Sequence, residues 1–194
     1  MTRRKAQYML FALIAAIVAA ACGDAVVPKP RGYFRIQLPE PQYEPFDSAA
    51  APYRFEKPVY SIIEPDRDAN SEPFWINIFY PRYNCKIHVT YRDIRTNAAD
   101  ALEDSRKLAY KHTIKADAIG ESFYENTDRH VFGTLYRIKG NAATPLQFEL
   151  TDSVRNLFRG SLYFYCKPNK DSLAPVVALV ESDIIHLMET FNWN

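Results

Sequence analysis

The chain has 194 residues, of which 47% are hydrophobic and 14% aromatic, and its 24 basic and 23 acidic side chains give a formal charge of +1. This composition excludes an intrinsically disordered chain, which would lack so many aromatic residues, and a typical nucleic-acid-binding protein, which would be strongly basic. A polytopic membrane protein would need repeated apolar runs of about 20 residues. One globular domain with a single core is therefore expected.

The first 22 residues resemble a secretion signal. Three basic residues at positions 3–5 precede an uncharged apolar stretch at 8–20, which is too short to span a bilayer stably. Alanines at 19–21 then meet Cys22. A bacterial lipoprotein signal requires this order, because the peptidase must reach the backbone and the thiol then takes a diacylglycerol. The sequence predicts lipidation of Cys22; the alternatives are an ordinary signal in which Cys22 is incidental, or a transmembrane anchor.

Cleavage before Cys22 would remove residues 1–21 and leave 173 residues. The removed segment contains three basic and no acidic side chains, so the charge would fall from +1 to −2. We expect a mildly acidic mature chain, held to a membrane by fatty acyl chains such as palmitate and exposed to an oxidising compartment.

Prolines are concentrated after this signal, since ten of the thirteen lie within residues 28–81. Proline lacks an amide donor and restricts the residue before it, so we expect an extended arm over residues 22–52. The arm carries aromatic residues, including Tyr33 and Phe34, that a solvated linker would not need. It is therefore expected to lie against one domain formed by residues 53–194.

Apolar residues alternate along eight segments of this domain, a pattern typical of strands. The predicted strands cover residues 53–56, 59–63, 74–80, 85–91, 119–125, 130–139, 145–151 and 158–166. A short turn after residue 80 predicts a hairpin from the third and fourth segments. The last four segments, joined by short turns, predict an antiparallel meander.

Two helices complete the predicted fold. One covers residues 98–116 with Asn97 as its cap, and the other covers 175–191 with Asp171 or Ser172 as its cap. The resulting class is α+β, in which an antiparallel sheet is covered by two main helices.

Three lysines of the first predicted helix, Lys107, Lys111 and Lys115, follow one another at four-residue spacing. We call them the lysine stripe. One interpretation is a solvated face, because Glu103 is placed to pair with Lys107; the other is a docking surface for an acidic partner. The 13 tyrosines also exceed the needs of a core and suit a protein interface.

Cys85 and Cys166 both fall on apolar faces of predicted strands. In an exported protein such a pair is a disulfide candidate, and closing a loop of about 80 residues would stabilise the fold by roughly 4 kcal/mol on the chain-entropy model. The alternative is two buried free thiols. The sequence leaves both open, because it does not show whether the strands lie within bridging distance.

No pattern in the sequence is typical of a catalytic, cofactor or metal site. Cys85 and His88 are three residues apart on a predicted strand and face opposite sides, while Asp183 and His186 form a single helical pair. The six glycines form no phosphate-binding loop, and no serine occupies a nucleophile elbow. An enzymatic site would need several of these residues to converge in a deep pocket: Asp117, His112, His130 and His186.

Five segments carry a family resemblance. They are VPKPRGYFRI at 27–36, LAYKHTIKADA at 108–118, IKGNAA at 138–143, PNKDSLAPV at 168–176 and HLMET at 186–190. Together they resemble the gliding motility lipoprotein GldD family, in that family's order and over nearly the whole mature chain. Neither cysteine of the candidate disulfide belongs to the family's pattern.

The resemblance implies a non-enzymatic lipoprotein of the cell envelope, at the outer membrane, that is needed for gliding and for the linked type IX secretion apparatus. It implies other gliding lipoproteins, designated B, H, J and K, as partners, and no cofactor. The order of elements is also similar to the PsbP-like sandwich.

The leading hypothesis is an assembly or stabilising subunit that uses the arm, with Tyr33 and Phe34, and the lysine stripe as partner surfaces. The alternative is an envelope enzyme or a small-ligand-binding lipoprotein.

Overall fold

The computed structural model describes residues 4, 7–9, 12–13, 36–111, 116–140, 142–166 and 169–194. The chain divides into two units, Met1–Phe34 and Arg35–Asn194. The described residues of the first unit are helical, and no helix in the described parts of the chain is long and apolar enough to cross a membrane. Cys22, Tyr33 and Phe34 lie outside the described residues.

The second unit contains the strands and helices of the fold. In chain order they are β1 Tyr43–Asp47, β2 Tyr53–Pro58, β3 Ile62–Pro65, β4 Ile76–Tyr80, a 3-10 turn Pro81–Tyr83, β5 Cys85–Asp93, α2 Ala98–Tyr110, β6 Ala116–Asn126, β7 Val131–Gly140, β8 Leu146–Thr151, β9 Asn156–Phe164, α3 Lys170–Thr190 and β10 Asn192–Trp193. β1 lies in the segment that the sequence assigned to the arm, and pairs with β2.

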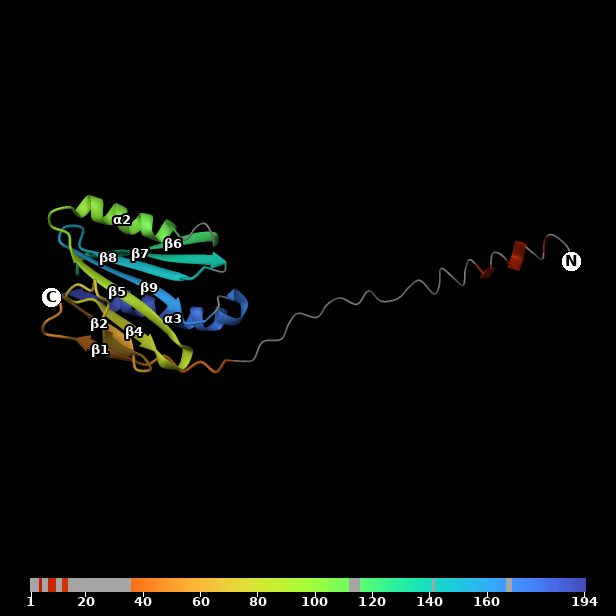
Figure 1. The fold of residues 1–194 in the computed structure, drawn as a ribbon, viewed down its shortest axis with the longest axis horizontal. Helices are drawn as coiled ribbons and strands as arrows, with labels where there is room; N and C mark the ends of the chain where they lie inside the picture. Colours follow the sequence, from red (N-terminus) through yellow and green to blue (C-terminus); the bar gives the residue numbers. More distant parts are fainter. Residues whose placement is uncertain are drawn as a thin grey trace. The chain divides into compact units, whose positions relative to one another are not determined.

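Seven strands form the main sheet in the order β3-β4-β5-β9-β8-β7-β6, and neighbouring strands are antiparallel (Figure 1). The hairpin of β4 and β5 and the meander from β6 to β9 are both confirmed. A smaller antiparallel sheet has the order β1-β2-β10. The mixed α+β class with antiparallel sheets is therefore confirmed.

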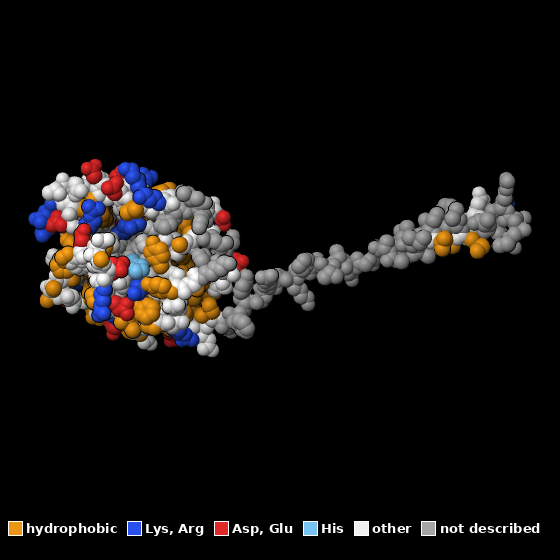
Figure 2. Space-filling view, viewed as in Figure 1, with side chains coloured by type: hydrophobic (Ala, Val, Ile, Leu, Met, Phe, Trp, Pro, Cys, Tyr) orange, Lys and Arg blue, Asp and Glu red, His pale blue; other side chains and the backbone are white. Residues whose placement is uncertain are grey.

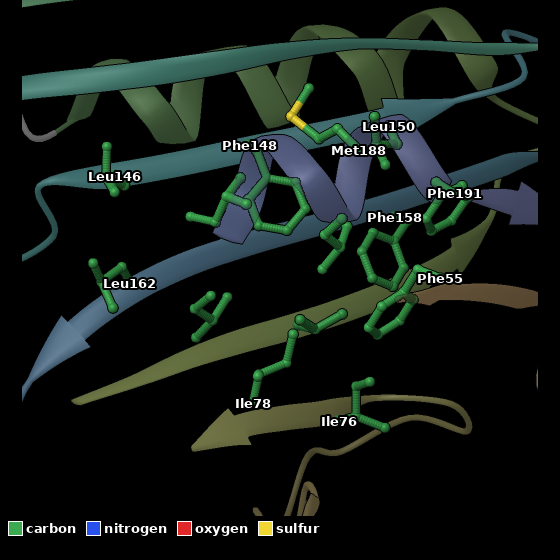
Figure 3. Close-up of a cluster of buried hydrophobic side chains, with 14 of the residues drawn as sticks. Phe55, Ile76, Ile78, Leu146, Phe148, Leu150, Phe158, Leu162, Met188 and Phe191 are labelled. Atoms are coloured by element: carbon green, nitrogen blue, oxygen red, sulfur yellow. The ribbon is translucent and has the colours of Figure 1, made fainter. Parts of the chain in front are cut away.

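One face of the main sheet carries the core. A row of residues that face each other across five strands marks it: Ile76, Val89, Gly160, Phe148 and Leu135. Phe148 belongs to the same buried cluster as Val180 of α3 and Phe55 of β2, so α3 and the small sheet cover this face. Figure 3 shows the aromatic centre of the cluster, where the ring centroids of Phe158 and Phe191 lie 4.9 Å apart.

The opposite face of the main sheet is more polar and is partly covered by α2. Ser105 of α2 donates a hydrogen bond to Glu149 of β8, whose other carboxylate oxygen accepts a bond of 2.9 Å from the Tyr136 hydroxyl. On the same face, Nη2 of Arg159 donates to Oε1 of Gln147 at 2.5 Å. Hydrogen bonds therefore contribute much of the contact on the face of the sheet that α2 covers, whereas apolar packing dominates the face that α3 covers.

Several element boundaries differ from the sequence prediction. α2 ends at Tyr110 rather than at residue 116, where β6 begins. α3 begins at Lys170 because the side chain of Asn169 accepts hydrogen bonds from two backbone N–H groups of the first turn, so Asp171 and Ser172 are not its cap. Pro175, the predicted first residue of this helix, lies inside it.

Candidate functional site

The most unusual polar group of the core face is the carboxylate of Asp183, which is only 1% exposed. It projects from α3 and accepts hydrogen bonds from the hydroxyls of Tyr43 on β1, at 3.1 Å, and Tyr60 before β3, at 2.8 and 3.0 Å. Buried carboxylates are costly unless their lone pairs are satisfied. The cluster therefore fastens α3 to two segments that lie more than a hundred residues earlier in the chain.

Titration of this cluster is shifted by its burial. Burial raises the pKa of Asp183, and the hydrogen bonds from Tyr60, Tyr43 and Tyr80 oppose but do not cancel this effect. Burial and the nearby carboxylate also raise the pKa of Tyr43 to about 12. The three tyrosines thus stay protonated at neutral pH and remain donors to Asp183.

His186 lies one helical turn after Asp183 and extends the same cluster. Its ring stacks on Tyr43 with the centroids 3.6 Å apart, and its Nε2 lies 2.7 Å from Oε2 of Glu56 on β2. Each of these side chains has a partner within the fold, and none of Asp183, Glu56 and Tyr43 lines the three grooves of about 490, 510 and 540 Å³ that the described residues form. The arrangement joins α3 to β1, to β2 and to the turn before β3.

From the sequence, Asp183 and His186 form a single helical pair that is too small for a metal site, and His186 is also one of the four residues of the alternative enzymatic site. The signal that marks Asp183 is its place within the apolar stripe of the helix, between Val180 and Leu187. An acidic residue in such a stripe indicates a buried partner, but its tyrosine partners are too distant in sequence to be assigned.

An apolar groove of about 510 Å³ lies where α3 begins, beside the ends of β7 and β9. Ile138, Phe164 and Val177 line it, as do Arg137 and Glu181, which form an ion pair with Nε and Oε1 2.6 Å apart.

The residues required for an enzymatic site do not converge in the described structure. Asp117 lines the apolar groove, but His130 and His186 do not, and His112 lies outside the described residues. Within the described ranges, no group of three or more His, Cys, Asp and Glu side chains is arranged to hold a metal ion.

Cys85 and Cys166 are free thiols in the structure. Cys85 lies buried on β5, where burial and the neighbouring Cys166 raise its pKa to about 12. The expectation that Cys166 lies on an apolar strand face is wrong, because β9 ends at Phe164 and Cys166 is exposed. Their disulfide stays a prediction.

The lysine stripe is only partly described. Lys107 lies 3.8 Å from Glu103 and 3.9 Å from Asp104, measured from Nζ to the nearer carboxylate oxygen. Lys111 is exposed directly after α2, and Lys115 lies outside the described residues. Acidic and basic side chains intermingle over α2 in Figure 2, which matches the pairing of Lys107.

Comparison with known proteins identifies a family for this chain. Residues 23–193 match the family model described as gliding motility lipoprotein GldD. No curated protein sequence matches the chain. Among solved structures, the solution structure of cyanobacterial PsbP (CyanoP) from Synechocystis sp. PCC 6803 is 12% identical, with a TM-score of 0.48, over 86% of this chain and 99% of that one.

Proposed function

Because the chain belongs to the gliding motility lipoprotein GldD family, we propose that it is an assembly or stabilising subunit of the gliding machinery and of the linked type IX secretion apparatus. The observation that carries this proposal is the extent of the family match, which spans residues 23–193. The match begins at residue 23, directly after Cys22, and the lipoprotein signal would be cleaved directly before Cys22.

Attachment to the envelope is proposed to occur through acyl chains on Cys22, with the outer membrane as the destination. Two or more acyl chains hold a protein stably to a bilayer, whereas a single chain gives marginal binding. The folded unit then needs no apolar membrane-spanning helix of its own.

A non-enzymatic role agrees with the chemistry of the described side chains. The buried ionisable groups of the core face, Asp183 and its partners, are occupied by one another. Their hydrogen bonds stabilise the contact between α3 and the first strands. We propose that the protein contributes surfaces to an assembly.

The proposed partners are the other gliding lipoproteins, those designated B, H, J and K. Tyr33 and Phe34 of the arm and Lys111 at the end of α2 are the proposed contact residues. Lys107 is a weaker contact candidate than Lys111, because Glu103 and Asp104 already lie within ion-pair distance of it.

Deletion of the gene, with complementation by three versions of it, tests the proposal. The intact chain is expected to restore gliding, secretion and the levels of the partner lipoproteins. Cys22→Ala is expected to leave the membrane fraction and to fail in all three respects, whereas Val154→Ala, a control at a residue that is 68% exposed, is expected to behave as the intact chain. A deletion strain that glides and secretes normally would refute the proposed function, and a Cys22→Ala protein that stays membrane-bound would refute the anchor.

A further inference from the structure

The two edges of the main sheet differ in how they are protected from pairing with another chain. β3, at one edge, has four residues and ends in Pro65. β6, at the other edge, has eleven residues, contains no proline, lysine or arginine, and pairs with β7 alone among the described strands. Natural proteins shield such long edges with charges, prolines or short length, because the free peptide groups of an edge accept further strands.

Peptide groups of β6 that point away from the sheet can be identified from its neighbour β7. The N–H of Ile138 donates to the carbonyl of Pro145, at 2.8 Å, and therefore points toward β8. The backbone N–H and C=O groups of successive residues point alternately to the two sides of a strand. Leu135 is an odd number of residues from Ile138, so its N–H and C=O groups point toward β6, where Leu135 pairs with Ser122.

The same alternation then applies within β6. Ser122 and Tyr124 bond to β7, and the N–H and C=O groups of the intervening residues, Glu121, Phe123 and Glu125, point to the free edge. These six groups match the ladder that an added strand requires. Figure 1 shows β6 at the margin of the sheet, beside α2.

Hollows for the side chains of an added strand lie on both faces next to this edge. On the α2 side, a hollow of about 490 Å³ is lined by Leu102, Phe123 and Phe132. On the α3 side, a hollow of about 180 Å³ is lined by Tyr124 and Met188. Strand addition uses backbone bonds for affinity and pockets on alternate faces for specificity. The 81% exposure of the Phe123 side chain adds apolar surface at the same place.

The charges on β6 favour one kind of added strand. Its charged residues are Asp117, Glu121 and Glu125, all acidic. A second copy paired antiparallel about Phe123 would place Glu121 of one copy opposite Glu125 of the other, and like charges in that position are destabilising. A basic segment would instead pair favourably along the strand.

We propose that β6 is a docking edge that accepts, by strand addition, an extended basic segment of a partner protein. The inference rests on the proposed function in that the chain acts through protein contacts. It names a surface that neither the arm nor the lysine stripe includes.

Photocrosslinking of the full-length lipoprotein in its own cells tests the docking edge. A photoreactive phenylalanine analogue replaces Phe123, and a control strain carries it at Val154, which is 68% exposed in the turn between β8 and β9. Sequencing of the crosslinked peptides is expected to show a lysine- and arginine-rich segment of another protein from position 123 and not from position 154. The second copy's β6, an acidic or neutral segment, or no specific crosslink would each overturn the inference.

A matched pair of second variants isolates the backbone contribution. Glu121→Ala and Glu121→Pro both remove the carboxylate and its bond to Tyr110, but only proline removes the outward N–H. The crosslink yield at position 123 is expected to be about tenfold lower with proline than with alanine, at equal thermal midpoints. Equal yields would overturn the inference. Normal gliding by a Glu121→Pro strain that has lost the crosslink, beside a non-gliding deletion strain, would separate the edge from the proposed function.

Discussion

The hydroxyl of the partly buried Tyr60 lies 2.8 and 3.0 Å from the two carboxylate oxygens of Asp183. This contact joins a turn near the start of the folded unit to its last helix. Because Asp183 is almost inaccessible to water, the cost of ionising it becomes part of the stability of the fold.

Asp183 is expected to give the protein an inverted pH dependence at this site. Its pKa is raised by burial, so the folded state holds the proton more tightly than the unfolded chain. The stabilisation is full below the unfolded pKa of about 3.9 and is lost as the pH rises through the higher folded pKa. Asp183→Asn removes this titration. Urea unfolding between pH 4 and pH 7 should show that the free energy of unfolding falls less with rising pH in Asp183→Asn than in the unmodified protein. Equal pH dependences in the two proteins would contradict the prediction.

Asp152 provides the control of opposite sign. Burial opposes its ionisation, but backbone N–H groups of Asn156, Arg155 and Val154 outweigh burial and lower its pKa. Its contribution is present above the unfolded pKa and is lost as the pH falls through the folded one. Asp152→Asn should therefore lower stability most at neutral pH, the reverse of the pattern expected at Asp183.

Position 160 is expected to require glycine, because the ring of Phe148 lies directly against it. A Cβ atom there would lie 2.2 Å from Cε1 of Phe148, a buried ring that has little room to move. Gly160→Ala should lower the free energy of unfolding by about 1–3 kcal/mol, the usual cost of overpacking. The matched control is Gly120→Ala on β6, where a Cβ meets nothing within 4 Å, and no loss is expected. Chemical denaturation compares the two; equal effects would exclude packing as the cause.

Tyr43 is expected to hold β1 through its ring and through its hydroxyl separately. Tyr43→Phe keeps the stacking on His186 but removes the bond to Asp183, which should cost about 1 kcal/mol. Tyr43→Ala also removes the stacked ring and should cost about 0.5–1.5 kcal/mol more. Hydrogen exchange of the β1 and β2 amides measures the effect, and faster exchange in Tyr43→Phe than in Tyr43→Ala would contradict it.

The two thiols should react at very different rates in the reduced, folded protein. Cys166 is exposed, whereas Cys85 is buried with a pKa of about 12 and has little thiolate at neutral pH. In a Cys22→Ser chain, iodoacetamide is expected to modify Cys166 first and Cys85 only after unfolding. Intact mass with peptide mapping follows the order; comparable rates for both would show that β5 does not shield its cysteine. A mass shift on reduction of the untreated protein reports the predicted disulfide.

Sequence patterns predicted the central strands of the main sheet well, because their residues alternate between a buried and a less buried face. Ile76 and Ile78 of β4 pair with Val89 and Ile87 of β5, as the alternation requires. Phe74 was expected to continue this face, but its positive φ of 70° breaks the strand before β4 begins. Side-chain alternation carries no information about such a local turn.

Long-range polar contacts were the part that sequence did not predict. Position 183 in the helical stripe indicates that its carboxylate is buried, yet its partners Tyr43 and Tyr60 lie on a short strand and in a turn with no distinguishing pattern. Thirteen tyrosines offer too many possible donors to choose among. The position of β6 at the edge likewise depends on the order of strands in the sheet, which follows from the three-dimensional pairing and not from the composition of β6.

The small sheet has a consequence for the order of folding. Its strand β2 is completed by β10, and the backbone N–H of Asn194 donates to the carbonyl of Pro52 at 3.0 Å. Phe191, just before β10, is fully buried against Phe158 and Tyr53. A nascent chain therefore lacks part of its core until residue 191 has been synthesised and released. Such a delay suits the export that the lipoprotein family implies, because a translocation channel accepts an unfolded chain.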